Sequence, residues 1–334
     1  MNQQSTIAVL GAGSWGTALA IQLARCGCSI TLWDHDAERL AQLNEARINH
    51  RYLPGVEFPS NLNLQSNLLV AADTPNILIV VPSHAFRQVL DQIAPTLTSN
   101  SRIAWGSKGL DGESGQWLSE VASSIVEPTT PLAVVGGPTF AAEVAAGNPS
   151  AITVASANLD FANDLATSLS CHDFRAYTSS DMMGVQVGGA VKNVLAVAAG
   201  IADGLSFGAN ARAALISRGL AEMARLGLVL GAEQETFLGL AGVGDLVLTC
   251  TDDQSRNRRF GLAIGNGKSI EQAERDIDQV VEGYRTTRLI WQKAKTLKVD
   301  MPITEQTYQV LYQNKDPRDA TLTLFERQLK SEAA

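Results

Sequence analysis

The strongest constraint on the fold is a glycine-rich turn close to the amino terminus. An apolar run over residues 7–10 ends at Gly11-Ala12-Gly13-Ser14-Trp15-Gly16, and residues 18–24 then show helical apolar spacing. In such a unit, the first glycine permits a tight turn, the second lets the backbone approach a pyrophosphate, and the third allows close packing of helix on strand. The helix amino terminus also offers free N–H groups to phosphates. The motif therefore predicts dinucleotide binding at Gly11, Gly13 and Gly16, rather than only a tight turn.

The same half of the chain alternates short apolar runs with helical segments. Further strands are expected at residues 29–33, 77–81, 102–105, 132–135, 151–155 and 174–177, with helices such as 83–94, 115–125 and 158–169 between most of them. This alternation is typical of a parallel sheet covered on both faces. From residue 180 onward only helical spacing is found. We therefore predict an α/β chain: a Rossmann-like doubly wound parallel sheet over residues 1–178, followed by an all-helical substrate-binding domain over 179–334.

Length and charge narrow the classes of function. The 334 residues leave room for about two domains. A formal net charge of −8 repels polyanions, which argues against general nucleic-acid binding. An anionic substrate must then be held by a local cluster of cations.

The cysteines and the apolar runs indicate whether the protein binds a metal or inserts into a membrane. In a chain of this length, four cysteines do not indicate a disulfide framework. The spacing of the four cysteines and four histidines does not match that of metal ligands. We expect reduced, packed thiols and no metal. The amino terminus has no basic segment, and we count no apolar stretch of the roughly 18 residues that span a bilayer. The sequence therefore predicts a cytoplasmic protein that does not insert into membranes.

A cation cluster in the second half is the candidate for substrate binding. It runs from Gly242-Val243-Gly244-Asp245-Leu246 to Ser255-Arg256-Asn257-Arg258-Arg259. A guanidinium can hold a phosphate bidentately, and amides and hydroxyls supply further donors. Taken alone, the segment is more typical of a solvated basic turn or a nucleic-acid patch, because arginine-rich turns are common. The dinucleotide motif upstream favours a small phosphorylated substrate.

Two lysines are candidates for chemistry. Lys108 follows the strand at 102–105, at the end where open α/β sheets bind ligands, although a surface lysine would look the same. Lys192 lies on a helix one turn after Gly188 and Gly189, and glycine inside a helix costs about 1 kcal/mol relative to alanine. Either a ligand or the other domain approaches the backbone there, or the helix packs closely on another with Lys192 turned outward.

The end of the second strand bears on the choice of cofactor. Asp34 stands near the roughly 20-residue spacing at which an acid binds the ribose 2′-OH of NAD, and such an acid repels the 2′-phosphate of NADP. His35, Arg39 and Arg51 could offset that charge. Alternatively, Asp34 only caps the next helix, for which Asp36 is an equal candidate. On balance we expect a modest preference for NADH.

Together these motifs resemble one family. They are Gly11 to Gly16, Val81-Pro82-Ser83-His84-Ala85-Phe86, Ser107-Lys108-Gly109, Gly136-Gly137-Pro138-Thr139, Lys192-Asn193, residues 242–246 and Ser255-Arg256-Asn257. In order and context, the chain resembles bacterial-type NAD(P)-dependent glycerol-3-phosphate dehydrogenases over essentially its whole length. The resemblance implies reversible reduction of dihydroxyacetone phosphate to sn-glycerol 3-phosphate with NADH or NADPH, which feeds phospholipid synthesis, in a protein that is often dimeric.

The resemblance also implies roles for individual residues. Lys192 falls on the catalytic lysine, which protonates the developing alkoxide, and partial burial and a second cation such as Lys108 would lower its pKa. Substrate positions are Lys108, Gly137, Thr139, Lys192, Asp245, Ser255, Arg256 and Asn257. Cofactor positions are Ser14, Trp15, His35, Phe86, Lys108, Ala141, Arg256, Val280 and Glu282, to which the glycine motif and the spacing described above add Gly11, Gly13, Gly16 and Asp34.

Two departures from the family pattern stand out. Asp252-Asp253 adds negative charge near the expected phosphate site, and Asp34 replaces a small residue beside the predicted ribose. Two other functions also fit the sequence: a lysine-dependent dehydrogenase of the same plan that acts on another hydroxy acid, and a protein that senses NAD(P) without catalysis.

Overall fold

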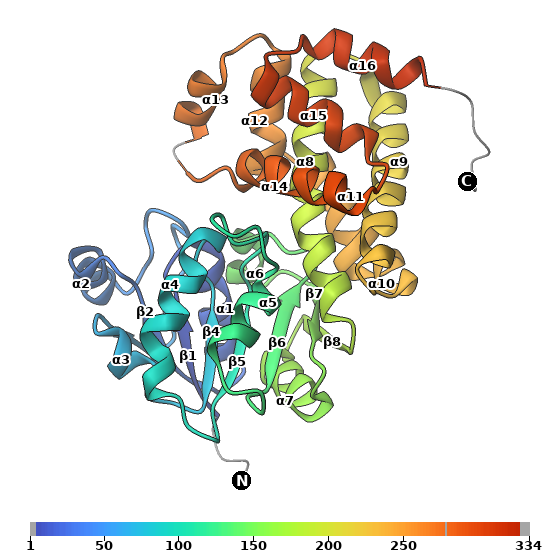
Figure 1. Cartoon of the computed structure of the whole chain (residues 1–334). Coiled ribbons are helices and arrows are strands. Elements are labelled where there is room, and N and C mark those ends of the chain that lie inside the picture. Colours follow the sequence, from blue (N-terminus) through green and yellow to red (C-terminus); the bar gives the residue numbers. More distant parts are fainter. Residues whose placement is uncertain (1–4, 278, 328–334) are drawn as a thin grey trace. The chain divides into compact units, whose positions relative to one another are not determined.

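The computed structural model describes residues 5–277 and 279–327 of the chain. They form two compact units. Figure 1 colours the chain from blue at its N-terminus to red at its C-terminus. The first comprises the residues up to Gln186 together with Leu238–Ala241, and the second comprises Val187–Phe237 and the residues from Gly242 onward. The division lies within a helix, beyond the predicted boundary between residues 178 and 179.

The first unit is built on one eight-stranded sheet. Its strands are β1 (Thr6–Leu10), β2 (Ser29–Trp33), β3 (Leu62–Gln65), β4 (Asn76–Ile79), β5 (Arg102–Trp105), β6 (Leu132–Gly136), β7 (Ser150–Ala155) and β8 (Phe174–Ser179). They lie in the order β3-β2-β1-β4-β5-β6-β7-β8. Among these strands, β6 and β7 alone pair antiparallel. The half-polar β3, which pairs with β2, escaped the sequence prediction.

Helices cover both faces of this sheet. They are α1 (Ser14–Arg25), α2 (Ala37–Ala46), α3 (Leu68–Ala71), α4 (Ser83–Ile93), the short 3-10 helix η1 (Ala94–Thr96), α5 (Leu118–Ile125), α6 (Ala141–Ala146) and α7 (Leu159–Leu169). On β1, Ile7 and Val9 enter the hydrophobic cluster that contains α1 and α7, whereas Ala8 and Leu10 enter the one that contains α4 and α5. Successive strand residues point to opposite faces, so both faces are buried. The doubly wound sheet is confirmed.

All elements after β8 are helical in the described residues. They are α8 (Met182–Gly204), α9 (Gly208–Val229), α10 (Gln234–Leu238), the π-helical turn η2 (Leu240–Gly244), α11 (Asp245–Thr251), α12 (Arg256–Gly265), α13 (Ile270–Ile277), α14 (Glu282–Leu297), α15 (Pro302–Gln313) and α16 (Pro317–Phe325). The predicted all-helical second half is confirmed.

The first turn of α8 packs with the sheet. Val185 belongs to the same hydrophobic cluster as β4 and β5, and a Cβ on Gly136 would lie 2.8 Å from Val185 Cγ1. The amide of Gln186 donates to Ser119 Oγ at 2.9 Å and accepts from the backbone N–H of Ser119 at 3.0 Å. These contacts explain why the first unit ends inside α8.

In the second unit, glycines bring α8 and α12 into backbone contact. A Cβ on Gly200 of α8 would lie 2.0 Å from the carbonyl oxygen of Arg258, and a Cβ on Gly261 of α12 would lie 2.0 Å from that of Val197. No side chain fits between the helices at these points, so their backbones approach closely. The contact places the start of α12 beside the middle of α8.

Helix α8 also corrects one prediction from the sequence. By length and composition it could cross a membrane, with a mean hydropathy of 1.5 over its most apolar window, although no such stretch was expected. Of that window, 94% is buried inside the protein. A buried core helix has the same properties, so this is weak evidence for a membrane span.

The expectation of four reduced cysteines is wrong for one pair. Cys26, at the end of α1, and Cys171, just before β8, form a disulfide across 145 residues. Packing of α1 against α7 brings the two together, which local sequence cannot show. Cys28 and Cys250 are free and buried, and burial raises the pKa of Cys250 to about 12.

Candidate active site

The glycine turn has the geometry that its motif predicts. Gly11 has φ of +121°, and a Cβ there would lie 2.6 Å from the carbonyl oxygen of Val80. A Cβ on Gly16 would lie 1.9 Å from the carbonyl oxygen of Gly11. By contrast, a Cβ on Gly13 would meet no atom within 4 Å, and no side chain caps α1 at this residue. Packing explains Gly11 and Gly16, and the uncapped helix start at Gly13 fits a phosphate ligand.

The carboxylate of Asp34 is occupied by this turn and by the next helix. Its Oδ2 accepts from the backbone N–H of Ala12 at 3.0 Å and from the guanidinium of Arg39, and its Oδ1 accepts from the N–H of Asp36 at 3.1 Å. Asp36, not Asp34, caps α2 by accepting from the N–H of Arg39 at 3.0 Å. The neighbouring His35 is 84% exposed and stands 3.2 Å from Asp34.

Several predicted residues gather at the carboxyl ends of β4 and β5. The hydroxyl of Ser107 donates to the carbonyl oxygen of Val81, and Lys108 follows it directly. The indole of Trp15 lies against Gly106, where a Cβ would stand 3.0 Å from its Nε1.

Phe86 lies away from this surface. It is fully buried, and its ring packs edge-on against Trp105 at 5.7 Å between centroids. This placement gives Phe86 a packing role, and its contact with a cofactor stays a prediction.

The loop after β6 carries Gly137, Thr139 and Ala141. Gly137 has φ of +147° and lies against Ile152 of β7. The hydroxyl of Thr139 donates to the carbonyl oxygen of Gly137 at 3.3 Å, and Phe140 is the N-cap of α6. Ala141 is the first residue of that helix.

The second unit contains a buried lysine with a carboxylate partner. Lys192 on α8 is 6% exposed, which excludes the outward-pointing alternative. Its Nζ donates to Asp245 Oδ1 at 2.7 Å and to Thr249 Oγ1 at 2.8 Å. The negative charge of Asp245 stabilises the ammonium, which would otherwise be costly to bury. The ammonium is therefore fixed in position by two partners.

The start of α11 presents both partners of Lys192. Asp245 is its first residue and Thr249 lies one turn later on the same face, where its hydroxyl also donates to the carbonyl oxygen of Asp245 at 2.6 Å. The preceding turn is π-helical, a form that often occurs at functional sites. Within it, a Cβ on Gly242 would lie 2.2 Å from the carbonyl oxygen of Phe237, so the tight approach requires glycine.

An amide chain lies beside the lysine. Asn257 of α12 donates to Asn193 Oδ1 at 2.9 Å and accepts from the backbone N–H of Gly283 at 2.9 Å. Asn193 follows Lys192 on α8, and its own Nδ2 is buried with no hydrogen-bond partner in the described part of the chain. A buried donor without a partner is costly and therefore points to a ligand.

The remaining candidates surround the start of α12. Ser255 is its N-cap and accepts from the N–H of Arg258 at 3.2 Å. Arg256 donates to Gln279 Oε1 at 2.7 Å, which brings the loop with the exposed Val280 to this guanidinium. Glu282 is the first residue of α14.

The acidic pair Asp252-Asp253 is balanced within the second unit. Asp253 pairs with the guanidinium of Arg258, which also donates to Asp203 Oδ2 at 2.7 Å. Asp252 accepts from the backbone N–H of Gln254 at 2.8 Å. The extra negative charge thus has partners of its own.

This arrangement can donate and accept a proton at Lys192 and can bind an anion at Arg256. Asn193 enters the sequence analysis only as part of a motif and Thr249 only as a position within the cation cluster, because their contacts depend on the packing of α8 against α11 and α12. Nowhere in the described residues do three His, Cys, Asp or Glu side chains gather as metal ligands would.

Comparisons with known proteins agree with this arrangement. Residues 6–162 match the family model of the NAD-dependent glycerol-3-phosphate dehydrogenase N-terminus, and residues 181–322 match that of its C-terminus. Proteins named glycerol-3-phosphate dehydrogenase [NAD(P)+] are 56% identical in Photobacterium profundum, over 99% of both chains, and 56% identical in Vibrio cholerae, over 97% of this chain and 95% of the relative. The crystal structure of glycerol-3-phosphate dehydrogenase from Coxiella burnetii superposes with a TM-score of 0.94 at 46% identity, over 97% of this chain and 99% of that one. The chain belongs to the NAD-dependent glycerol-3-phosphate dehydrogenase family.

Proposed function

We propose that this chain catalyses the reversible reduction of dihydroxyacetone phosphate to sn-glycerol 3-phosphate with NADH or NADPH. The observation that carries the proposal is the buried Lys192, held by Asp245 and Thr249 beside the amide chain of Asn193 and Asn257. An acid–base group of this kind serves a carbonyl reduction, and membership of the family supports the substrate.

Lys192 supplies the proton in this mechanism. When bound, the reduced nicotinamide supplies the hydride that adds to the carbonyl carbon. The ammonium of Lys192 gives its proton to the carbonyl oxygen as negative charge develops there, and the neutral amine takes the proton back in the reverse direction. Asp245 and Thr249 hold Nζ in one position, which saves the entropy of orienting it for each turnover.

The start of α12 binds the substrate phosphate. Arg256 can form two parallel charge-assisted bonds with it once the amide of Gln279 gives way or shares the guanidinium. The buried Nδ2 of Asn193 donates to a substrate oxygen, which satisfies this otherwise unpaired group. Lys108, Gly137, Thr139, Ser255 and Asn257 complete the proposed substrate contacts.

The glycine turn binds the cofactor. The open space at Gly13 and the uncapped start of α1 support binding of its pyrophosphate there. The other proposed cofactor residues are Ser14, Trp15, His35, Phe86, Lys108, Ala141, Arg256, Val280 and Glu282.

We also propose a cellular setting for the enzyme. We place the enzyme in the cytoplasm as a homodimer that supplies glycerol 3-phosphate for phospholipid synthesis, without nucleic acid, metal or membrane insertion. Size-exclusion chromatography with light scattering tests the dimer, and a monomeric mass would contradict it.

One absorbance assay separates this function from its two alternatives. Purified protein with NADPH or NADH should oxidise the cofactor when dihydroxyacetone phosphate is added. Oxidation only with an unphosphorylated keto acid would indicate a dehydrogenase for another hydroxy acid. Tight cofactor binding without oxidation by any of these carbonyl compounds would indicate a sensor.

A further inference from the structure

Asp34, which the sequence predicts to bind the cofactor ribose, binds other groups of the protein in the structure. Asp34 is only 4% exposed, and its two oxygens already accept from the backbone of Ala12 and Asp36 and from the guanidinium of Arg39. A ribose hydroxyl would have to share oxygens that the glycine turn and α2 already use. Asp34 thus holds Arg39 in place beside the glycine turn.

Arg39 is the group that Asp34 holds in place. Its guanidinium lies 5.4 Å from the ring centroid of Tyr52, and Arg51 lies 5.5 Å from the same centroid. The side chain of Arg39 is 18% exposed, and its buried Nε has no hydrogen-bond partner in the described residues. A guanidinium has five N–H donors, so the bond to Asp34 leaves others for a ligand.

The position of Arg39 relates it to one part of a dinucleotide. In this class of sheet, the acid at the end of the second strand marks the place of the adenosine ribose and its 2′ substituent. Arg39 forms an ion pair with Asp34, so its guanidinium lies next to the position expected for the ribose 2′ substituent. Arginine also matches a phosphate bidentately, which a ribose hydroxyl does not require.

We propose that Arg39 selects the cofactor by binding the 2′-phosphate of NADPH, and that Asp34 is its positioning residue rather than a ribose ligand. The inference rests on the proposed cofactor site at the glycine turn. It reverses the modest preference for NADH that Asp34 suggested from sequence, because the carboxylate charge is matched by the arginine.

The test is direct binding, without turnover. Dissociation constants for NADPH and NADH are measured by quenching of tryptophan fluorescence, together with adenosine 2′,5′-bisphosphate and AMP as probes that lack nicotinamide. Arg39→Gln should weaken NADPH and the bisphosphate by about tenfold or more, the usual effect of losing a charge-assisted bond, and should leave NADH and AMP within about threefold.

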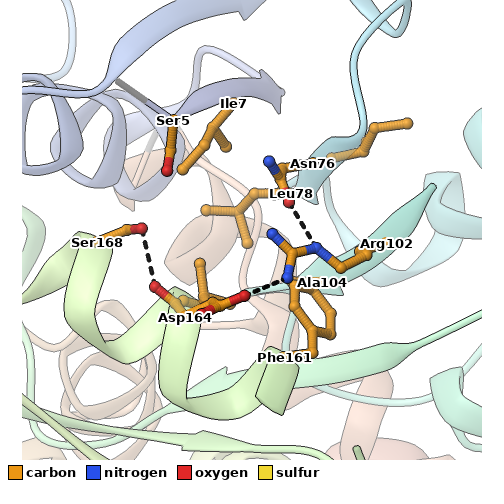
Figure 2. Close-up of a pocket in the computed structure, with 11 residues that line it drawn as sticks. Ser5, Ile7, Asn76, Leu78, Arg102, Ala104, Phe161, Asp164 and Ser168 are labelled. Carbon is orange, nitrogen blue, oxygen red and sulfur yellow. Dashed lines mark hydrogen bonds and ion pairs between the residues drawn. The ribbon is translucent and has the colours of Figure 1, made fainter. Parts of the chain in front are cut away.

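The matched control is Arg102→Gln. Arg102, at the start of β5, also pairs with a carboxylate and lies near a ring (Figure 2). Its partner Asp164 stands at 2.6 Å and the ring centroid of Phe161 at 5.0 Å, although Asp164 is more exposed than Asp34. This variant should change neither pair of constants selectively. An equal effect of the two substitutions would overturn the proposal, as would a parallel weakening of NADPH and NADH by Arg39→Gln.

Asp34→Asn provides a second and independent test. Its amide oxygen can still accept from Ala12 but holds Arg39 without an ion pair, so NADH affinity should stay within about threefold while NADPH affinity falls, by less than in Arg39→Gln. Selective loss of NADH would show that Asp34 is a ribose ligand and would overturn the proposal. In this background Arg39→Gln should still weaken NADPH selectively, and loss of that effect would mean that Arg39 only neutralises Asp34. Failure of the wild type to bind either dinucleotide would instead contradict the proposed function itself.

Discussion

At the residue scale, Lys192 is a charged side chain that is almost fully buried. A buried ammonium is tolerated only with a partner, and its partner here comes from another helix. Such a pair contributes little to stability compared with apolar packing. Its position beside the unpaired amide of Asn193 therefore supports a role in turnover.

Replacing Lys192 should remove proton transfer. We expect Lys192→Ala to lower kcat by roughly 10²–10⁴, the usual worth of a positioned acid–base group, with little change in cofactor affinity. Lys315→Ala is the control, because Lys315 also has ordered polar partners in Gln306 and Thr323. Steady-state kinetics across pH decide the matter, and near-normal kcat in Lys192→Ala at every pH would exclude the proposed role.

Replacing Arg256 should weaken the hold on phosphate. Each charge-assisted bond is worth about 1.5–3 kcal/mol, so loss of two should lower kcat/KM for dihydroxyacetone phosphate at least about a hundredfold. Unphosphorylated dihydroxyacetone should be used equally poorly by wild type and Arg256→Ala. Arg259→Ala, an exposed position on the same helix, controls for the change in charge. A large penalty on the truncated substrate as well would place Arg256 at the cofactor.

At the element scale, the contact of α8 with α12 decides where the site residues stand. Glycines at the crossing let the two backbones meet, and the meeting brings Asn193 and Asn257 within 2.9 Å of each other. Helices separated by ordinary side chains have axes about 8–10 Å apart, so larger residues here would move α12 away from α8.

A methyl group at this crossing should therefore disturb both stability and substrate binding. Gly261→Ala should destabilise the protein by about 1–3 kcal/mol, because its Cβ would lie 2.0 Å from the carbonyl oxygen of Val197. It should also raise KM for dihydroxyacetone phosphate. In Gly219→Ala the Cβ would meet the flexible end of Leu195 instead, so a smaller cost is expected. Urea unfolding and kinetics on both variants test this, and equal behaviour of the two would contradict it.

At the scale of the whole molecule, one buried carboxyl makes stability depend on pH. Glu222 of α9 accepts from the backbone N–H of Ile303 at 2.5 Å and from that of Thr304 at 3.1 Å, at the start of α15. Burial raises the pKa of Glu222 to about 7, against an ordinary value of 4.5. The folded state therefore binds a proton more tightly than the unfolded chain.

This raised pKa gives the sign of the effect. The contribution of Glu222 to the free energy of unfolding is fully present below pH 4.5. It decreases by about 3 kcal/mol as the pH rises to about 7. Urea unfolding of wild type and Glu222→Gln between these pH values isolates it, since the variant has no carboxyl to ionise. The difference in unfolding free energy between the two proteins should change by that amount, and a constant difference would exclude the effect.

The amino-acid sequence by itself determined what depends on local conformation. Glycines at fixed offsets specify the turn before α1, and apolar periodicity specifies strands or helices, because both are set by neighbours within about one helical turn. These patterns predicted the doubly wound sheet and the helical second half, and they made the family motifs recognisable. Some site residues could be named from these motifs and the others from the family resemblance, and their contacts with ligands stay predictions.

Only the tertiary structure decided how distant residues pair. Lys192 meets Asp245 across 53 residues, Cys26 meets Cys171 across 145, and Arg39 occupies the carboxylate of Asp34. The antiparallel pairing of β7 with β6 and the polar edge strand β3 were likewise invisible. Such pairings arise when whole elements pack, and the energy of that packing is spread over many side chains. No single segment of sequence records it.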